Sequence, residues 1–206
     1  MILATEDDLR AGIRALVALE PRFAAAHALT GDPPLRCRPR GFATLLHIVN
    51  GQMLSTAAAA AIWARIEAAG LHDPAAIARV EEEALRALGF SRAKARTARA
   101  LAAADLDFAA LEALPDAELL KTLTALPGIG RWTAELYALT AEGRPDILPA
   151  GDLALQEGAR LLFELPSRPS PRAFTELAAP WSPWRAVAAR LLWAYYAHFR
   201  KRAGVT

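Results

Sequence analysis

The sequence predicts an all-α protein, and three observations support this fold class. Alanine and leucine recur throughout a chain that is 54% apolar, and both residues favour helices. Apolar runs rich in β-branched residues, which would predict strands, are almost absent. The 14 prolines and 12 glycines fall mostly between segments of helical periodicity, where they end helices. A chain of 206 residues can form one compact body with a large core, or two small helical lobes.

The helices expected in the first half of the chain begin at polar caps and end at glycine or proline. Leu9, Ile13, Leu16 and Val17 have helical spacing after an acidic start. Further helices are expected here over about 22–29, 41–49, 56–70 and 91–103. Between the last two, another helical stretch is expected to begin at His72-Asp73-Pro74 and to end at Gly89.

In the second half, short helical pieces are expected at 108–114 and 116–125, with Pro115 as the first helical residue of the second piece. Longer helices are expected over about 131–141, from Asp152 to near Glu164, and over about 183–200. The last of these is apolar on most faces, which is typical of a core helix. The segments 143–151 and 166–171 are expected to be a loop and a linker.

Composition limits which binding sites the protein can contain and in which cellular compartment we expect it. The net charge of +2 and the pI near 9.0 permit nucleic-acid binding without arguing for it. The single cysteine, Cys37, excludes an intramolecular disulfide and a multi-cysteine metal cluster, and no histidines have metal-ligand spacing. We therefore expect no cofactor and no metal site made of side chains. Without a signal peptide or an apolar run of ~18 residues, we expect a soluble cytoplasmic protein with no membrane partner.

The most informative stretch is Leu126-Pro127-Gly128-Ile129-Gly130-Arg131-Trp132-Thr133-Ala134, between two expected helices. Pro127 ends the first helix, and the two glycines allow positive φ and close backbone approach. Ile129 is suited to anchor the turn in the core. The amides after Gly128 are expected to be free at the start of the next helix, where a DNA phosphate can bind. The alternative is an ordinary turn between helices with a glycine cap.

This stretch and three others resemble base-excision DNA glycosylases of the helix-hairpin-helix superfamily. After the hairpin, Leu148-Pro149-Ala150-Gly151-Asp152 resembles the superfamily's Gly/Pro-rich loop that ends in aspartate. Gly51-Gln52-Met53-Leu54-Ser55 and Trp181-Ser182-Pro183-Trp184-Arg185, with Trp193 further on, are similar to segments of the DNA-3-methyladenine glycosylase II family. The resemblance covers about 41–196, and the four blocks occur in the family's order.

The resemblance implies a two-lobed helix-hairpin-helix glycosylase fold with the active-site cleft between the lobes. In that arrangement, N-terminal helices in 1–43 pack with the C-terminal lobe. Residues 44–144 form a middle lobe that contains the hairpin, and residues 145–206 form a C-terminal segment with the catalytic aspartate. The family's extra N-terminal α+β domain is not expected in this chain.

By the same resemblance, Asp152 is the catalytic aspartate. A carboxylate facing C1′ stabilises an oxocarbenium-like transition state or orients the attacking water. An alkylated purine is already cationic, so it leaves without a strong general acid. Bifunctional relatives have a lysine where this chain has Trp132, and tryptophan cannot form an imine. We therefore expect base removal without lyase activity; the alternative for Asp152 is a plain helix N-cap.

The other site residues also follow from the resemblance. Trp132 and Trp193 correspond to aromatic residues of the base pocket, whose electron-rich faces attract a cationic base. Leu136 stands where the methyladenine enzyme has tyrosine. Met53 corresponds to an apolar wedge that fills the gap left by the flipped nucleotide, with Gln52 bracing it or contacting the opposite strand. Core packing is the alternative for Met53 and for both tryptophans. The hairpin residues expected at the phosphate are Pro127, Gly128, Ile129, Gly130, Arg131 and Thr133.

The sequence thus predicts a monomeric, monofunctional glycosylase that excises alkylated purines of the 3-methyladenine and 7-methylguanine type from duplex DNA in base excision repair. In a prokaryote it would be associated with the nucleoid. Alternatives are a glycosylase for uracil, hypoxanthine or mismatched adenine, a non-enzymatic helix-hairpin-helix DNA-binding module, and a helical protein unrelated to DNA. The sequence leaves open the preferred lesion, the opposite-base preference and whether the hairpin backbone binds a monovalent cation.

Overall fold

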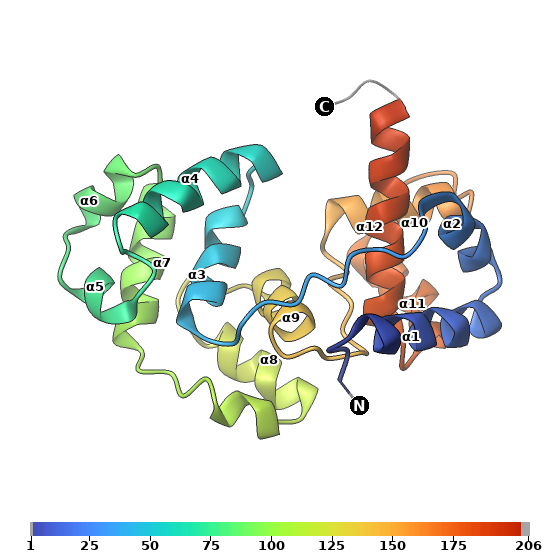
Figure 1. Cartoon of the computed structure of the whole chain (residues 1–206), viewed down its shortest axis with the longest axis horizontal. Coiled ribbons are helices and arrows are strands. Elements are labelled where there is room, and N and C mark those ends of the chain that lie inside the picture. The colour runs from blue at the N-terminus through green and yellow to red at the C-terminus, as the bar shows by residue number, and fades with distance from the viewer. Residues whose placement is uncertain (1, 203–206) are drawn as a thin grey trace. The chain divides into compact units, whose positions relative to one another are not determined.

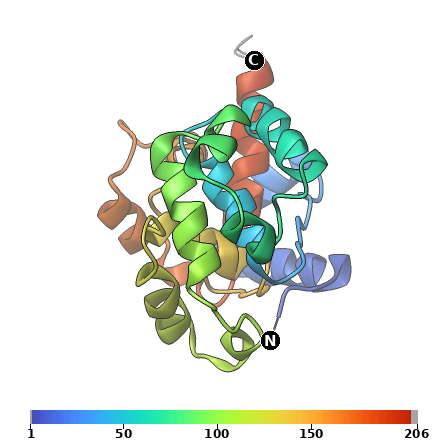
Figure 2. The same cartoon turned by 90° about the vertical axis from the view of Figure 1, so that its left-hand side faces the viewer.

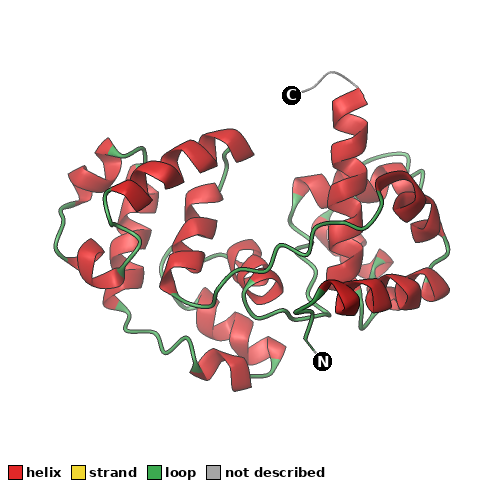
Figure 3. Ribbon diagram, in the orientation of Figure 1, coloured by secondary structure: helices red, strands yellow, loops and turns green. Residues whose placement is uncertain are grey.

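The computed structural model describes residues 2–202, with side chains through Arg200, and confirms the all-α class. Within that range it contains twelve α-helices, α1 to α12, two short 3-10 helices and no strand (Figure 3). None of the helices in this part of the chain is both long and apolar enough to span a bilayer. The chain divides into two compact units: unit 1 is Met1–Cys37 with Gly143–Thr206, and unit 2 is Arg38–Glu142.

Unit 1 combines helices from both ends of the chain. Its helices are α1 (Glu6–Leu19), α2 (Arg22–Thr30), α10 (Leu153–Leu162), α11 (Pro171–Leu177), η2 (Ala179–Trp181) and α12 (Arg185–Arg202). The long helix α12 packs against α1, α2 and α10 (Figure 1). An aromatic cluster of Phe23, Phe163, Phe174 and Trp181 fills the core of this unit. The N-terminal helices are therefore part of the same core as the C-terminal ones.

Two glycines let helices of unit 1 approach α12 closely. A Cβ at Gly12 on α1 would meet Val187 at 2.7 Å and Trp184 at 2.8 Å. A Cβ at Gly158 on α10 would lie 2.7 Å from the carbonyl oxygen of Leu192. These contacts are closer than side chains tolerate, so glycine at both positions fixes how near α1 and α10 lie to α12.

Unit 2 is formed by the continuous segment between the two parts of unit 1. Its helices are α3 (Phe42–Gly51), α4 (Thr56–Ala68), α5 (Pro74–Ala78), α6 (Glu82–Ala87), α7 (Arg92–Ala103), η1 (Ala110–Ala113), α8 (Asp116–Thr124) and α9 (Arg131–Thr140). Helix α3 packs against α4, α7 and α9, and α7 also packs against α5 and α6 (Figure 2). The α8–α9 pair forms the helix-hairpin-helix.

The structure differs from the sequence-based elements in several places, of which the following bear on the helix ends. The stretch after His72 forms two helices, α5 and α6; Glu81 at the N-cap of α6 makes no side-chain capping bond, but the acidic residues in the first turn favour a new N-terminus. Pro115 is the N-cap of α8 with ψ 150° and not its first helical residue, while the helix itself starts at Asp116, as the expected range did. Helix α11 was not predicted, although Ser170 caps it and Pro171 is its first residue. Helix α12 begins at Arg185, two residues after the predicted start.

Candidate active site and nucleic-acid interface

Asp152 lies at the N-cap of α10, directly after the Gly/Pro-rich loop, with φ −75° and ψ 120°. Its Oδ1 accepts the amides of Ala154 at 2.9 Å and Leu155 at 3.0 Å, and the indole Nε1–H of Trp193 at 3.2 Å. Asp152 is therefore a helix cap, as the alternative interpretation held. Capping does not compete with a chemical role, because the same bonds fix the direction of the carboxylate, and a helix N-terminus suits an anion.

The loop before Asp152 is held by side chains from the helices that follow it. Asp146 forms a bidentate ion pair with Arg185, with both N–O distances 2.7 Å, and accepts the Ser182 hydroxyl at 2.8 Å. Burial raises the pKa of Asp146, but the bonds from Arg185 and Ser182 outweigh it and lower the pKa overall. At the other end of the loop, the buried amide of Gln156 donates to the carbonyl of Ala150 at 2.7 Å. The position of Asp152 is thus set from both sides of the loop.

Trp193 reaches Asp152 because α10 and α12 approach closely at Gly158. Trp193 is predicted to line the base pocket, but its hydrogen bond to Asp152 is a contact that the sequence does not predict. The bond joins residues 41 positions apart, so no spacing rule could have indicated it. The indole is half-buried, which leaves both a positioning function and a pocket function open to this side chain.

The hairpin is anchored at its centre and exposed around it. Ile129 is 3% exposed, whereas Pro127, Gly128, Gly130 and Arg131 are exposed. The anchoring role expected for Ile129 agrees with this burial. Its amide, however, donates to the carbonyl of Leu126 at 3.1 Å, so the expectation that every amide after Gly128 is free was wrong for Ile129.

The two hairpin glycines, Gly128 and Gly130, differ in backbone conformation and in the space around them. Gly128 has φ 79°, and a Cβ there would overlap the hydroxyl of Thr97 on α7. Gly130 has φ −81° and ψ 172°, so it does not use the positive φ that glycine allows. Nothing lies within 4 Å of a Cβ built at Gly130. Its open surface at the N-cap of α9 suits the close approach of a ligand backbone.

Two polar residues on the first turns of α9 are buried. Thr133 is 2% exposed, and its hydroxyl accepts the Gln52 amide at 2.9 Å, so its side chain braces unit 2. Glu135, which was not among the predicted site residues, is 4% exposed and accepts a hydrogen bond from Arg131 at 2.7 Å. Burial raises the pKa of Glu135, and the ion pair with Arg131 only partly offsets that rise.

Trp132 and Leu136 lie four residues apart on α9, and therefore on one face of the helix. Both are half-buried, whereas the residues between and beside them, 133–135 and 137–139, are buried. This partly exposed face is the geometry that a wall of a base pocket requires. Complete core packing, the alternative for Trp132, does not agree with its exposure.

The wedge turn, residues 51–54, connects α3 to the start of α4. The amide of Leu54 donates to the carbonyl of Gly51 at 3.3 Å. With Gln52 at φ −55° and ψ 129° and Met53 at φ 57°, the turn has type II dihedral angles. Met53 is 100% exposed, which excludes the alternative of a buried core methionine. A fully exposed apolar side chain on a backbone that favours glycine indicates a functional constraint.

Two side chains hold the wedge turn. The Gln52 amide donates to Thr133 Oγ1 at 2.9 Å and to the carbonyl of Gly128 at 3.4 Å, which joins the turn to the hairpin. The Lys94 ammonium donates to the carbonyls of Asn50 and Gln52 at 2.7 Å and 2.6 Å. Bracing by Gln52 was one of the two roles that the sequence left open; the contacts of Lys94 were not foreseen.

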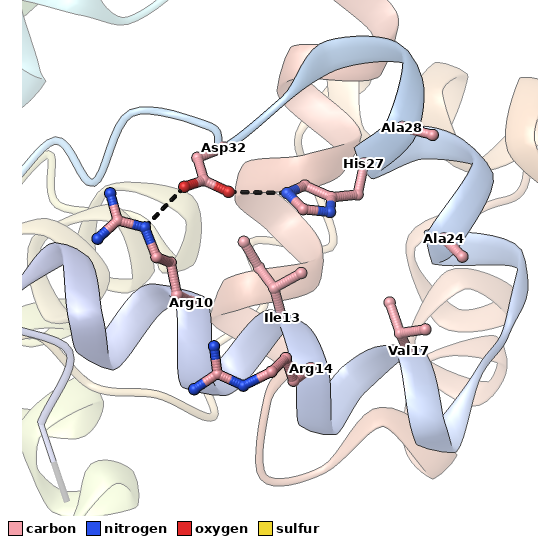
Figure 4. Close-up of a pocket in the computed structure, with 8 residues that line it drawn as sticks. All are labelled: Arg10, Ile13, Arg14, Val17, Ala24, His27, Ala28 and Asp32. Atoms are coloured by element: carbon pink, nitrogen blue, oxygen red, sulfur yellow. Dashed lines mark hydrogen bonds and ion pairs between the residues drawn. The ribbon is translucent and has the colours of Figure 1, made fainter.

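Unit 1 also contains a hollow of about 370 Å³ between α1 and α2 (Figure 4). The carboxylate of Asp32 on its rim binds Arg10 at 2.9 Å and His27 at 2.7 Å. Ile13 and Val17 line its apolar part. None of the residues predicted to act on DNA lies in this hollow. Among the described residues, no three His, Cys, Asp or Glu side chains are close enough to form a metal site.

Comparison with known proteins agrees with this geometry. Over 125 residues, the chain is 34% identical to the alkylbase DNA glycosidase-like protein mag2 of Schizosaccharomyces pombe, covering 58% of this chain and 59% of the relative. Over 158 residues it is 32% identical to DNA-3-methyladenine glycosylase 1 of the same yeast, covering 72% and 69%. A solved structure of the S. pombe 3-methyladenine DNA glycosylase Mag1 in complex with abasic DNA superposes with a TM-score of 0.80 at 29% identity, covering 89% of this chain and 95% of that one.

An all-α chain with an exposed helix-hairpin-helix and an aspartate capping a later helix defines the class of helix-hairpin-helix DNA repair proteins. The chain belongs to the HhH-GPD superfamily of base excision DNA repair proteins, whose family model matches residues 46–183. The predicted superfamily and the predicted helix-hairpin-helix glycosylase fold are thereby confirmed.

Proposed function

We propose that the protein is a monofunctional DNA glycosylase that flips an alkylated purine out of duplex DNA and hydrolyses its N-glycosidic bond. The observation that supports this most is the Asp152 carboxylate, held by three donors on one oxygen at the start of α10. The relatives named for 3-methyladenine support the choice of lesion.

In the proposed reaction the C1′–N bond breaks, and the departing base keeps the electron pair that neutralises its positive charge. Asp152 stabilises the positive charge that develops on the sugar. A water oxygen then bonds to C1′, and its proton passes to Asp152 or to solvent, which leaves an abasic site. Trp132 presents an indole face to the cationic base. Because this indole stands where an imine-forming lysine would be needed, no strand cleavage follows.

The proposal is tested by Asp152→Asn. Asparagine caps helices about as well as aspartate does, so α10 should keep its start while the negative charge is lost. Release of 7-methylguanine from methylated duplex DNA should fall by about 100-fold or more, with little change in melting temperature. The matched control is Asp73→Asn at the cap of α5, where Asp73 accepts the amide of Ala76 at 3.1 Å. Undiminished release by Asp152→Asn would contradict the assignment.

A panel of substrates separates the remaining alternatives. Duplexes that contain 3-methyladenine, 7-methylguanine, hypoxanthine, uracil or mismatched adenine should show release of the alkylated bases first. Release of uracil or mismatched adenine alone would identify a different glycosylase, and binding without release would indicate a non-enzymatic module. Borohydride should trap no covalent complex, and binding should weaken steeply with salt if hairpin contacts to phosphates dominate.

We further propose that the protein acts as a monomer, in the cytoplasm and near the nucleoid if its source is a prokaryote. Sedimentation equilibrium should give the mass of one chain, 22.1 kDa. A concentration-dependent rise in mass, or recovery of the protein from a membrane fraction, would contradict these two proposals.

A further inference from the structure

The wedge turn and the hairpin both contact α7. Lys94 binds the wedge turn, and Thr97, one helical turn later, packs against the hairpin. We propose that Lys94 is a positioning residue that holds the wedge turn in register with the hairpin, so that Met53 is aligned before DNA binds. This inference rests on the proposed function, because it assumes that Met53 enters the duplex.

The first support for it is the contact made by the Lys94 ammonium. It bridges two carbonyls on either side of the end of α3, at Asn50 and at Gln52. The carbonyls in the last turn of a helix lack intrahelical partners and lie at the negative end of the macrodipole. A cation that donates to both therefore caps α3 and fixes the central peptide of the wedge turn, between Gln52 and Met53, in the same contact.

The second support is the geometry of α7. One turn after Lys94, Thr97 packs against Gly128 so closely that only glycine fits there. The Gln52 amide connects the two contacts by reaching Thr133 Oγ1 and the carbonyl of Gly128. Lys94, Gln52 and Thr97 thus form a continuous path from the wedge turn to the hairpin, all within unit 2.

The third support is that residues other than Met53 must stabilise the backbone conformation of the wedge turn. Met53 is 100% exposed, so its side chain adds no packing that would keep its backbone at φ 57°. Charge-assisted hydrogen bonds from a fixed lysine can maintain a conformation that the side chain itself disfavours. Burial lowers the pKa of Lys94, because it disfavours the charged ammonium. The two hydrogen bonds to carbonyls offset part of this cost of desolvation.

Hydrogen exchange of the Leu54 amide tests the holding of the turn without any DNA, because this amide donates to Gly51 across the turn. In Lys94→Met, the exchange rate of this amide should rise by about 10-fold or more. In Lys94→Arg, which keeps the charge and the donors, it should stay closer to wild type. If Lys94→Met does not fold, Lys94→Gln replaces it, because its shorter side chain cannot span both carbonyls.

A second measurement follows the wedge in DNA. The probe is a duplex with a tetrahydrofuran abasic analogue opposite 2-aminopurine, whose fluorescence changes when a side chain enters the stack. Lys94→Met should reduce this change and lower the single-turnover rate of base release by about 10-fold or more, with affinity for undamaged duplex nearly unchanged. The matched control is Arg99→Met, which removes a charge from α7 where Arg99 pairs with Glu81; it should leave all readouts near wild type.

The outcomes separate this inference from the proposed function. Unchanged Leu54 exchange and unchanged fluorescence in Lys94→Met would overturn the positioning role, as would an equal loss in Arg99→Met, which would indicate bulk charge. If wild type releases no base from any duplex of the panel, the proposed glycosylase activity fails. The exchange and fluorescence results would then still decide whether Lys94 positions Met53.

Discussion

Met53 has a backbone conformation that its residue type disfavours. Its αL backbone costs a non-glycine residue roughly 1–2 kcal/mol, and its side chain is fully exposed and gains no burial in return. Met53→Gly should therefore increase the free energy of unfolding by about 1 kcal/mol, measured in urea.

The same substitution should lower the rate of base release, because glycine cannot fill the space of a flipped nucleotide. Met53→Leu is the control: it keeps an apolar wedge and should change neither stability nor rate strongly. Base release by Met53→Gly at the wild-type rate would show that the exposed side chain does not act on DNA.

His47 on α3 predicts a pH dependence of stability. Its ring packs edge-on against Trp63 with centroids 4.7 Å apart, and its buried Nδ1 has no hydrogen-bond partner among the described residues. Burial, with a smaller effect of the Arg38 charge, lowers the pKa of His47 from 6.5 to about 4. A depressed pKa in the folded state means that the unfolded chain binds the proton more tightly, so this contribution is present above pH 6.5 and is lost as pH falls toward 4.

The loss should be no more than about 3 kcal/mol by pH 4, because water reaches part of the half-buried ring. Urea unfolding at several pH values between 7 and 4 measures it. His47→Phe, which keeps an aromatic ring beside Trp63, should weaken the decline over this window. An identical pH dependence in both proteins would show that other groups cause it.

At the scale of elements, the hairpin permits a paired prediction. Gly128→Ala must hold alanine at φ 79° and displace Thr97, so it should lower the free energy of unfolding by about 2 kcal/mol or more. Gly130→Ala has an ordinary φ and open space, so its stability should stay within about 0.5 kcal/mol of wild type.

Affinity for duplex DNA should respond differently to the two changes. If the backbone at Gly130 approaches a phosphate, the methyl group of Gly130→Ala should weaken binding of undamaged duplex, measured by fluorescence anisotropy. Normal affinity in that variant would place the phosphate elsewhere on the hairpin.

Local signals predicted most of these elements. The caps at Thr5, Ser55, Ser91 and Asp152 each start a helix in the structure, because a side-chain acceptor satisfies amides within its own turn. Ser170 gives the same signal and caps α11, a helix that was not predicted. The hairpin and its anchoring Ile129 also followed from residues adjacent in the chain.

Contacts between distant residues could not be predicted in this way. The bonds from Lys94 to the wedge turn span 44 and 42 residues, the pair Asp146–Arg185 spans 39, and the indole of Trp193 reaches Asp152 across 41. Each depends on how two helices pack, which no spacing within one segment encodes. The resemblance to glycosylases supplied candidate residues for the site, but not the partners that hold them.

At the scale of the whole molecule, unit 2 is continuous in sequence and has its own core, whereas unit 1 needs both ends of the chain. A chain of residues 38–142 should therefore fold alone, and circular dichroism should show helices that melt cooperatively. Residues 1–37 alone should be largely unfolded, because α1 and α2 pack against α12. Loss of cooperative melting in the 38–142 chain would show that unit 2 depends on unit 1.

Because unit 1 is discontinuous in sequence, it also determines the order in which parts of the chain can fold during translation. Helices α1 and α2 emerge first, but α10 and α12, which cover their apolar faces, are made last. The hairpin and the wedge turn belong to the segment between them and can fold while α12 is still being translated. A nascent chain that stalls before α12 would thus present a folded hairpin and wedge turn together with two uncovered N-terminal helices, which chaperones and proteases recognise.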